Sequence, residues 1–519
     1  MPNNEETVQT EAFQVSKSKE NLERRQQAGR ERLEGRWQPE RSQPVLEAGN
    51  VQYEVAGRAQ AVGCGGLGML QTVVEVVGLR EALDASLQLF KRHLPYHESD
   101  HVLSLTYNLL TGGRCLEDLE RRRQDVAYLD ALGARRIPDP TTAGDFLRRF
   151  DAAAVEALMA AINQTRAGVW RAQPRADRQL ATIDVDGSIV ETSGHCKERM
   201  DVSYDGRWGY GPLLVSLANT QEVLFAVNRP ASRPSHDGAA RWLDEAITWA
   251  REAAGFARVR LRGDTDFSLT AHFDRWTAAG VEFVFGMDAM PGLVRRAQAL
   301  PDEAWKPMQR NDKRHRGGRR RRRAPDVKAE VVATKGYRTL TLTEEHIAEV
   351  AYRPRACRQP YRLIVLRKRI RVTQGQLHLE DEIRYFFYIT NLPAGQMSPR
   401  AVVRDNNARC HQENLIEQLK NGVAATRPPV REFDANWAYL VIGALAWNLK
   451  CWAALLLPAQ FGARALLHME FRRFLHEIVM LPAQIVSTGR RLVFRLLAIN
   501  RWTALLLEGT PQLRRWCFP

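Results

Sequence analysis

The sequence lacks any pair of cysteines separated by two residues. Its seven cysteines are scattered instead, at positions 64, 115, 196, 357, 410, 451 and 517. No charged and then apolar leader opens the sequence, so neither secretion nor a disulfide framework is expected. Internal repeats are also absent from the sequence. We therefore predict a cytoplasmic protein.

Long apolar runs are scarce, and residues 437–458 form the most apolar stretch. A membrane-spanning helix needs about 20 mostly apolar residues, and polar or charged groups at its centre are costly. Asn448 and Lys450 lie near the middle of this stretch. The stretch therefore predicts a buried core helix, and no membrane partner is expected.

What the sequence has in excess is positive charge. Lys and Arg number 75 against 60 Asp and Glu, which gives a formal net charge of +15 and a pI of about 9.7. Such a balance is typical of proteins that meet phosphate backbones, with an acidic membrane surface as the competing partner. A chain of 519 residues is long enough for about three or four domains.

The hydrophobic pattern changes near residue 180 from a helical period to a strand period. The elements expected after this point are strands at 180–187, 212–218 and 223–228, a helix at 237–255, a strand at 257–264, a helix around 268–279 and a strand at 281–287. The predicted order is therefore βββαβαβ.

The first of these strands ends in Asp-Val-Asp-Gly-Ser, and two classes of enzyme carry carboxylates in this way. "IDVDGS" resembles the first motif of haloacid-dehalogenase-type phosphatases, and "RGDTDF" at 262–267 resembles their late acidic motif. Both would hold magnesium through carboxylates at strand ends. That fold has a parallel sheet throughout, whereas here the first motif leads into hairpin strands. An RNase-H-like fold, with three antiparallel strands before a helix and a parallel strand, matches the order found.

The carboxylates of this second fold have candidates in the sequence. Alternation along the first strand places Ile183 and Val185 on one face and Asp184 and Asp186 on the other. Either aspartate can therefore point into one site. Asp264 lies at the C-terminal end of the fourth strand, near the carboxylates of the first. Two such groups hold a metal ion but leave room for a third ligand.

A helix after residue 400 supplies the third ligand. At about 100° per residue, Arg409, Glu413 and Lys420 fall within about 40° of one another, with Asn406 close by. Glu417 lies at the edge of this face, so Glu413 is the predicted acid. One helix face thus carries base, acid and base.

Together these motifs resemble the DDE transposases of bacterial insertion sequences, in the group marked by a Tyr-x2-Arg-x3-Glu-x6-Lys helix. Arg409, Glu413 and Lys420 match this spacing, whereas Asn406 stands at the tyrosine position. In members with this fold the triad is two aspartates and a glutamate, with a β-rich insertion between the second and the third. The site implied by the resemblance consists of catalytic, metal-binding Asp186 (or Asp184), Asp264 and Glu413, with Arg409, Lys420 and Asn406 on DNA.

A basic segment at 313–323 lies inside the expected insertion. Its last five residues are Arg319, Arg320, Arg321, Arg322 and Arg323. Such a run neutralises phosphates or remains a solvated loop, and both interpretations are open. DNA contact is the interpretation that agrees with the resemblance.

The resemblance implies a transposase that binds the terminal inverted repeats of an insertion sequence and cleaves and joins DNA. It also implies two Mg²⁺ or Mn²⁺ ions per site, target DNA as a further partner, a homodimer on paired ends, and a place in the bacterial cytoplasm at the nucleoid. The alternatives are the phosphatase and a domesticated transposase that binds DNA without cutting it. Intact acids at all three places argue against the domesticated form.

The predicted fold class is α/β, with an RNase-H-like catalytic core (βββαβαβ-α) interrupted by a β-rich insertion and flanked by helical N- and C-terminal regions. The predicted segments are a disordered 1–55, a helical DNA-end-binding domain at 56–172, the first part of the core at 173–290, the insertion at 291–400, the last part of the core at 401–460 and a helical region at 461–519.

Overall fold

Among the residues that the structure describes, nine strands form one continuous sheet in the computed structural model. The described residues are 20–31, 52–53, 60–91, 95–194, 196–308, 331, 334–375, 377–488 and 491–516. The strands lie in the order β10-β11-β12-β13-β9-β8-β2-β6-β7. The last five form the core of the fold, and the first four belong to the insertion.

The core half of the sheet combines antiparallel and parallel pairing. Strand β2 (Leu180–Gly187) pairs antiparallel with β6 (Leu213–Leu217), which pairs antiparallel with β7 (Glu222–Val227). On its other side β2 runs parallel to β8 (Arg258–Gly263), and β8 runs parallel to β9 (Glu282–Met287). This is the RNase-H-like arrangement, so the predicted fold class is confirmed. The antiparallel partner of β2 excludes the phosphatase alternative, whose sheet is parallel throughout.

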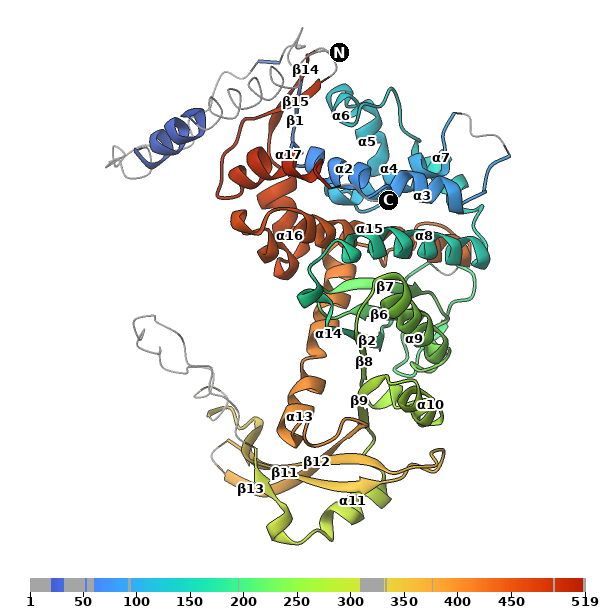
Figure 1. The fold of residues 1–519 in the computed structure, drawn as a ribbon, viewed down its shortest axis with the longest axis vertical. Helices are drawn as coiled ribbons and strands as arrows, with labels where there is room; N and C mark the ends of the chain where they lie inside the picture. Colours follow the sequence, from blue (N-terminus) through green and yellow to red (C-terminus); the bar gives the residue numbers. More distant parts are fainter. Residues whose placement is uncertain are drawn as a thin grey trace.

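Helices cover both faces of this half of the sheet. Figure 1 shows α9 (Ala239–Thr248) and α10 (Phe273–Ala278) on one side, and α13 (Pro399–Asn407) with α14 (Cys410–Glu417) on the other. Helix α9 buries an apolar stripe at helical spacing, formed by Ala239, Trp242, Leu243, Ala246 and Ile247. A π-helical turn at Trp249–Ala253 continues α9 toward β8.

A small separate sheet interrupts the predicted pair of consecutive hairpins between β2 and β6. It contains β3 (Val190–Glu191), β5 (Trp208–Tyr210) and β4 (Asp201–Val202), in this order. Lys197 anchors it, because its Nζ donates to the carbonyls of Pro428 and Val430 at 2.7 and 2.8 Å. The excursion therefore packs against the segment that follows α14.

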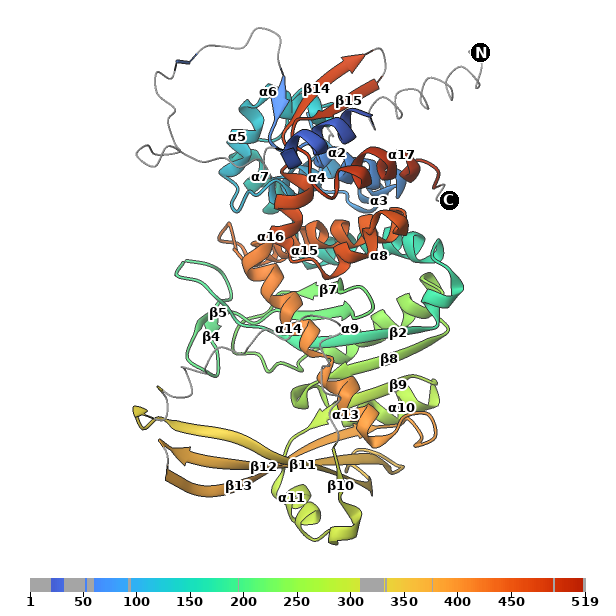
Figure 2. The same cartoon turned by 90° about the vertical axis from the view of Figure 1, so that its left-hand side faces the viewer.

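The insertion extends the core sheet rather than forming a separate one. Strands β11 (Arg338–Tyr352), β12 (Tyr361–Gln374) and β13 (Leu377–Thr390) are long and antiparallel, and β13 pairs antiparallel with β9. Two short elements precede them, α11 (Pro291–Gln298) and β10 (Lys306–Pro307). Figure 2 shows the long strands projecting on the same side of the molecule as β4 and β5.

The N-terminal region is helical, as the fold class predicts. Its described helices are α2 (Leu67–Val76), α3 (Leu79–Ser86), α4 (Glu98–Leu110), α5 (Asp118–Gln124), α6 (Val126–Leu132), α7 (Pro140–Leu147) and α8 (Ala152–Arg171). The sequence predicts disorder over 1–55, but residues 20–31 form an exposed helix. Most of the remaining part of that segment lies outside the described residues.

The C-terminal region also contains a β-hairpin that the sequence does not predict. Strand β14 (Ala483–Thr488) pairs antiparallel with β15 (Arg491–Leu496), and β1 (Ala61–Val62) pairs antiparallel with β14. Two short helices flank the hairpin, α16 (Phe471–Phe474) and α17 (Thr510–Leu513). The hairpin thus joins the C-terminal region to the start of the N-terminal helices.

Helix α15 (Phe433–Leu456) is the one described helix that is long and apolar enough to cross a membrane, and its apolar window is 100% buried inside the protein. Lys450 donates to the carbonyls of Leu467 and Met469 at 3.2 and 2.8 Å, and its Nζ lies 3.7 Å from the ring centre of Trp447. Burial lowers the pKa of Lys450 to about 8. The prediction of a buried core helix is confirmed.

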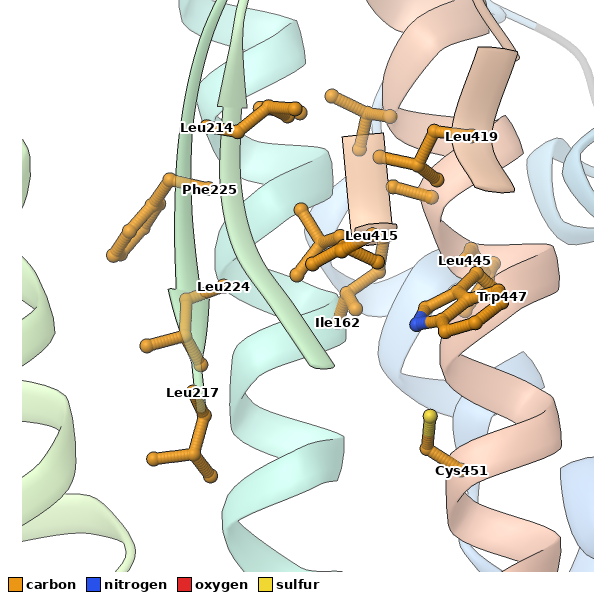
Figure 3. Packing of buried hydrophobic residues seen from close by; sticks show 14 of the residues in the cluster. Ile162, Leu214, Leu217, Leu224, Phe225, Leu415, Leu419, Leu445, Trp447 and Cys451 are labelled. Carbon is orange, nitrogen blue, oxygen red and sulfur yellow. The ribbon is translucent and has the colours of Figure 1, made fainter. Parts of the chain in front are cut away.

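The outer edge of β7 is covered by α8 and α15. Asn448 of α15 donates to the carbonyl of Val223 at 3.0 Å and accepts from its backbone nitrogen at 2.9 Å. Trp437 donates to the carbonyl of Ala226 at 2.6 Å. These contacts use backbone groups that an open edge strand would offer to another chain. Figure 3 shows the apolar packing of α8, β7 and α15, represented by Ile162, Leu224 and Leu445, together with Leu214 of β6 and Leu415 of α14.

A buried ion pair between α8 and β7 should contribute strongly to stability. Glu222 accepts from Arg166 Nε at 3.1 Å and from the indole nitrogens of Trp170 and Trp452 at 2.9 and 2.8 Å, and the Arg166 and Glu222 side chains are fully buried. Removing one partner leaves a buried charge uncompensated, so Glu222→Gln should lower the free energy of unfolding by about 3–5 kcal/mol. Urea denaturation measures this loss.

A matched control lies on the surface between α8 and α9. Glu156 forms an ion pair with Arg241 at 2.6 Å, with side chains 35% and 57% exposed. Because solvent screens such pairs, Glu156→Gln should cost less than about 1 kcal/mol. Similar losses for the two variants would contradict the assigned importance of the buried pair.

Candidate active site

Asp186 and Asp264 lie at the same end of two neighbouring parallel strands. In the register of β2 and β8, Asp184 is opposite Arg262, so the positions two residues further along bring Asp186 next to Asp264. Asp186 is the penultimate residue of β2, and Asp264 directly follows β8. Their side chains are 13% and 34% exposed. Two of the predicted acids are therefore adjacent and reachable from solvent.

Asp184 is held away from this edge by a buried ion pair. Its carboxylate accepts from Nε and Nη2 of Arg262 at 2.7 and 2.8 Å, and its side chain is only 1% exposed. Arg262 also donates to the carbonyl of Asp405 in α13 at 2.9 Å. Both oxygens of Asp184 are thus engaged with an internal partner, and Asp186 is the aspartate at the open edge.

The helix that carries the third acid is broken just before it. The sequence predicts one continuous helix, but α13 ends at Asn407 and α14 begins at Cys410. Arg409 is the N-cap residue of α14 and Glu413 lies in its first turn. Glu413 is 60% exposed, whereas Arg409 is 14% exposed. The break therefore places Arg409 between the sheet edge and the glutamate.

The guanidinium of Arg409 contacts all three predicted acids. Its Nη1 donates to Asp186 Oδ2 at 2.8 Å. Its Nη2 lies 3.9 Å from Asp264 Oδ2 and 3.5 Å from Glu413 Oε1. The structure thus brings the three acids together around a single positive charge.

The surroundings of the two aspartates at this edge disfavour the ionised form of both carboxyl groups. Desolvation raises the pKa of Asp186 to about 7 against the lowering effect of Arg409, and the charge of Asp264 adds to the rise. Desolvation also raises the pKa of Asp264, which Arg409 lowers and Asp266 raises further. Buried acids close to one another are stabilised in their charged form by a bound cation. The edge is therefore suited to cation binding.

The donor set fits a hard divalent cation, although the acids are not yet grouped around one. Three carboxylates are the ligands that Mg²⁺ and Mn²⁺ prefer. Within the described ranges, no three Asp, Glu, His or Cys side chains lie close enough to hold a metal ion. At this site the guanidinium of Arg409 stands among the acids. Asp186, Asp264 and Glu413 thus have the chemistry of metal ligands, but they share the guanidinium of Arg409.

Lys420 lies near the site, but the predicted angular position does not apply to it. Helix α14 passes into a π-helical turn over Gln418–Gly422, which changes the rotation of later side chains from α-helical spacing. Nζ of Lys420 donates to the carbonyl of Ile189 at 2.8 Å. Burial lowers the pKa of Lys420. The side chain thus braces the chain just beyond Asp186.

The predicted DNA contact of Asn406 is wrong. Asn406 is 8% exposed, and its amide nitrogen donates to the carbonyls of Gly263 and Val284 at 3.1 and 3.4 Å. A buried amide whose donors are used by the backbone is not available to phosphates. Asn406 instead attaches α13 to the last residue of β8, which precedes Asp264, and to the middle of β9.

Sequence reasoning missed Gln412, which positions the glutamate helix. The buried Gln412 side chain accepts from the hydroxyl of Ser216 and donates to the carbonyl of Leu214 at 3.2 Å, so it ties α14 to β6. A signal exists in the sequence, because Gln412 shares one helical stripe with Leu415 and Leu419. A polar residue on an apolar stripe indicates an internal hydrogen bond.

The arginine run lies outside the described residues. It comprises Arg319, Arg320, Arg321, Arg322 and Arg323. Its contact with DNA therefore stays a prediction from charge alone.

An RNase-H-like sheet carries aspartates at the ends of its first and fourth strands, and α14, which follows the insertion, carries a glutamate; this is the arrangement of DDE-type polynucleotidyl transferases. Residues 43–517 match the family model described as transposase DDE domain group 1. The match covers most of the chain, so the protein belongs to this transposase family. It is thus a DNA-acting enzyme, and DDE transposases generally use divalent metal ions.

Comparison with individual proteins adds little to this assignment. A search of curated proteins finds no match. Among solved structures, the chain is similar to a piggyBac transposase in a synaptic complex with hairpin DNA, at 9% identity and a TM-score of 0.35. The similarity covers 80% of this chain and 82% of that one. At this TM-score the likeness carries no argument about the site.

Proposed function

We propose that the protein binds the terminal inverted repeats of an insertion sequence and catalyses DNA cleavage and strand transfer. The convergence of Asp186, Asp264 and Glu413 on Arg409 is the observation that supports this proposal. In cleavage, an oxygen of water forms a bond to phosphorus and gives up a proton, while the bond to the 3′-oxygen breaks and that oxygen takes up a proton. In strand transfer, the freed 3′-hydroxyl oxygen bonds to a phosphorus of target DNA, and the oxygen displaced there takes up a proton.

We infer that Asp186, Asp264 and Glu413 hold two Mg²⁺ or Mn²⁺ ions. Such ions activate the attacking oxygen and stabilise the leaving oxygen of a phosphodiester. The chain keeps its acids in place through backbone and side-chain contacts: Asn406 attaches α13 to β8 and β9, and Gln412 attaches α14 to β6. Asp184 contributes through its buried pair with Arg262, not as a ligand.

DNA contacts belong to the basic residues around these acids. Arg409 and Lys420 match the basic positions of the family's helix, and we infer that both hold phosphates of the transposon end. For Lys420 this requires release from the carbonyl of Ile189. The run Arg319 to Arg323 is proposed to neutralise phosphates without reading bases.

The family resemblance supports a homodimer that acts on paired transposon ends and then on target DNA. The bacterial cytoplasm, at the nucleoid, is the place where such an enzyme meets its substrate. No membrane partner is required, because the apolar helix α15 is buried.

The test is a cleavage assay on DNA that carries the element's own terminal repeats. We expect nicking and joining with Mg²⁺ or Mn²⁺ and no product after chelation, because the divalent ion would activate the attacking oxygen and stabilise the leaving oxygen. DNA with scrambled ends is the matched control and should react poorly. DNA binding without cleavage under any metal would instead indicate a domesticated protein.

A further inference from the structure

We propose that Arg409 occupies the place of the divalent metal when no DNA is bound, so that binding of a DNA end withdraws Arg409 and opens the metal site. This inference rests on the proposed function, because it assumes that Asp186, Asp264 and Glu413 are the metal ligands. It assigns to Arg409 a positioning role in addition to the phosphate contact that its place on the helix implies.

The guanidinium of Arg409 is shared by three acids. Arg409 hydrogen-bonds Asp186 at 2.8 Å and lies within ion-pair distance of Asp264 and Glu413, at 3.9 and 3.5 Å. A guanidinium stays charged throughout the physiological pH range and presents five donors in a planar fork. It can therefore hold the three carboxylates at one point without any metal.

Arg409 and a bound metal ion would compete for the same carboxylate oxygens. Asp186 Oδ2 is the acceptor of the short hydrogen bond from Arg409, and a metal at this edge would take the same oxygen. The guanidinium of Arg409 and a metal ion cannot both take this oxygen, because one carboxylate oxygen cannot accept a hydrogen bond from one cation and ligate another at the same point.

A DNA phosphate can replace the three acids as the partner of Arg409. Arg409 is the N-cap residue at the break between α13 and α14, and its side chain makes no capping hydrogen bond, so moving the side chain removes no cap from α14. Phosphates accept bidentate hydrogen bonds from arginine as well as carboxylates do. A DNA phosphate near the site therefore offers Arg409 an alternative partner, and the vacated acids then attract the metal.

The consequence is thermodynamic coupling between DNA and metal. If a DNA end removes Arg409 from the acids, it raises their metal affinity, and by linkage the metal raises the affinity for the DNA end by the same factor. An enzyme built in this way is poor in bound metal until it holds its substrate, which restrains cleavage of DNA elsewhere.

Mn²⁺ binding to the full-length protein, followed by isothermal titration calorimetry without DNA, tests the proposal. We expect Arg409→Gln to bind Mn²⁺ about tenfold more tightly than the wild type, because a competing positive charge is gone. Arg409→Lys keeps the charge and should fall between the two. Arg241→Gln is the matched control: it removes the charge of an exposed arginine on α9 that pairs with Glu156 and not with these acids, and it should change the affinity by less than about twofold.

A second measurement checks that the titrated site is the proposed one. Adding Asp186→Asn to Arg409→Gln should abolish the gain in Mn²⁺ affinity, and thermal melts of each variant show that the fold persists. Equal Mn²⁺ affinities for wild type and Arg409→Gln would overturn the exchange while leaving the metal site itself intact. Absence of Mn²⁺ binding in every variant, with DNA ends present as well, would overturn the proposed function.

Discussion

Glu413→Gln should abolish DNA cleavage and strand transfer while leaving binding to transposon ends unchanged. The amide keeps the size of the side chain but loses the charge that completes the metal site, so the rate should fall by roughly a thousandfold or more. Glu413 is 60% exposed, and its one ion pair is the long contact with Arg409 at 3.5 Å. Folding should therefore be unaffected. A cleavage assay, paired with a gel-shift assay on the same DNA, measures both effects.

Glu417→Gln provides the control on the same helix. Glu417 is exposed one turn after Glu413, and it accepts a hydrogen bond from Asn421 at 2.6 Å. Within the described part of the chain, the ion pairs of the acids at the sheet edge are with Arg409 and not with Glu417, so cleavage should stay within about twofold of wild type. An inactive Glu417→Gln together with an active Glu413→Gln would mean that the glutamate helix has been assigned in the wrong register.

Asp186→Asn should lose cleavage activity but not stability, whereas Asp184→Asn should lose stability but keep most of its cleavage activity. The two residues are nevertheless neighbours on one face of β2. Asp186→Asn should reduce cleavage by roughly a thousandfold or more, because a metal ligand is lost. Its stability should be unchanged or slightly higher. Burial raises the pKa of Asp186 to about 7, so the ionised carboxylate destabilises the fold above the ordinary pKa of an aspartate, and a neutral amide removes that cost.

Asp184→Asn should instead lower the free energy of unfolding by about 3 kcal/mol, because it leaves the buried Arg262 without its bidentate partner. The contacts of Arg262 with Asp405 moderate this loss. Below the melting temperature, cleavage should stay within roughly tenfold of wild type. Denaturation curves and cleavage rates measured on both variants decide the matter. A stable but inactive Asp184→Asn would show that the two aspartates have been given the wrong roles.

Several features of the site were open to sequence reasoning because they depend on local pattern. The change from helical to strand spacing near residue 180 located the sheet, and a carboxylate at the end of each of two strands marked its edge. Arg409 and Glu413 are four residues apart in the sequence, and they form an ion pair in the structure. A polar stripe residue such as Gln412 could have been recognised by the same spacing argument.

Other features depend on contacts that no local pattern contains. The break after α13 and the π-helical turn at Gln418–Gly422 interrupt a helix that spacing alone makes continuous. Asn406 is a polar residue of the kind usually found at the surface, but carbonyls of β8 and β9 accept hydrogen bonds from its buried amide. The hairpin of β14 and β15 gains a partner in β1, which lies more than four hundred residues earlier in the chain.

By itself the sequence determined the class of fold and the residue types at the active edge, because periodicity and strand-end carboxylates are written in neighbouring residues. Only the tertiary structure decided between Asp184 and Asp186, which share one face of β2 and look alike locally. The difference comes from Arg262, 78 residues further along the chain, which is brought beside Asp184 by parallel pairing and neutralises it in the interior. Asp186, two residues on, is left at the edge with Asp264, Glu413 and the guanidinium of Arg409.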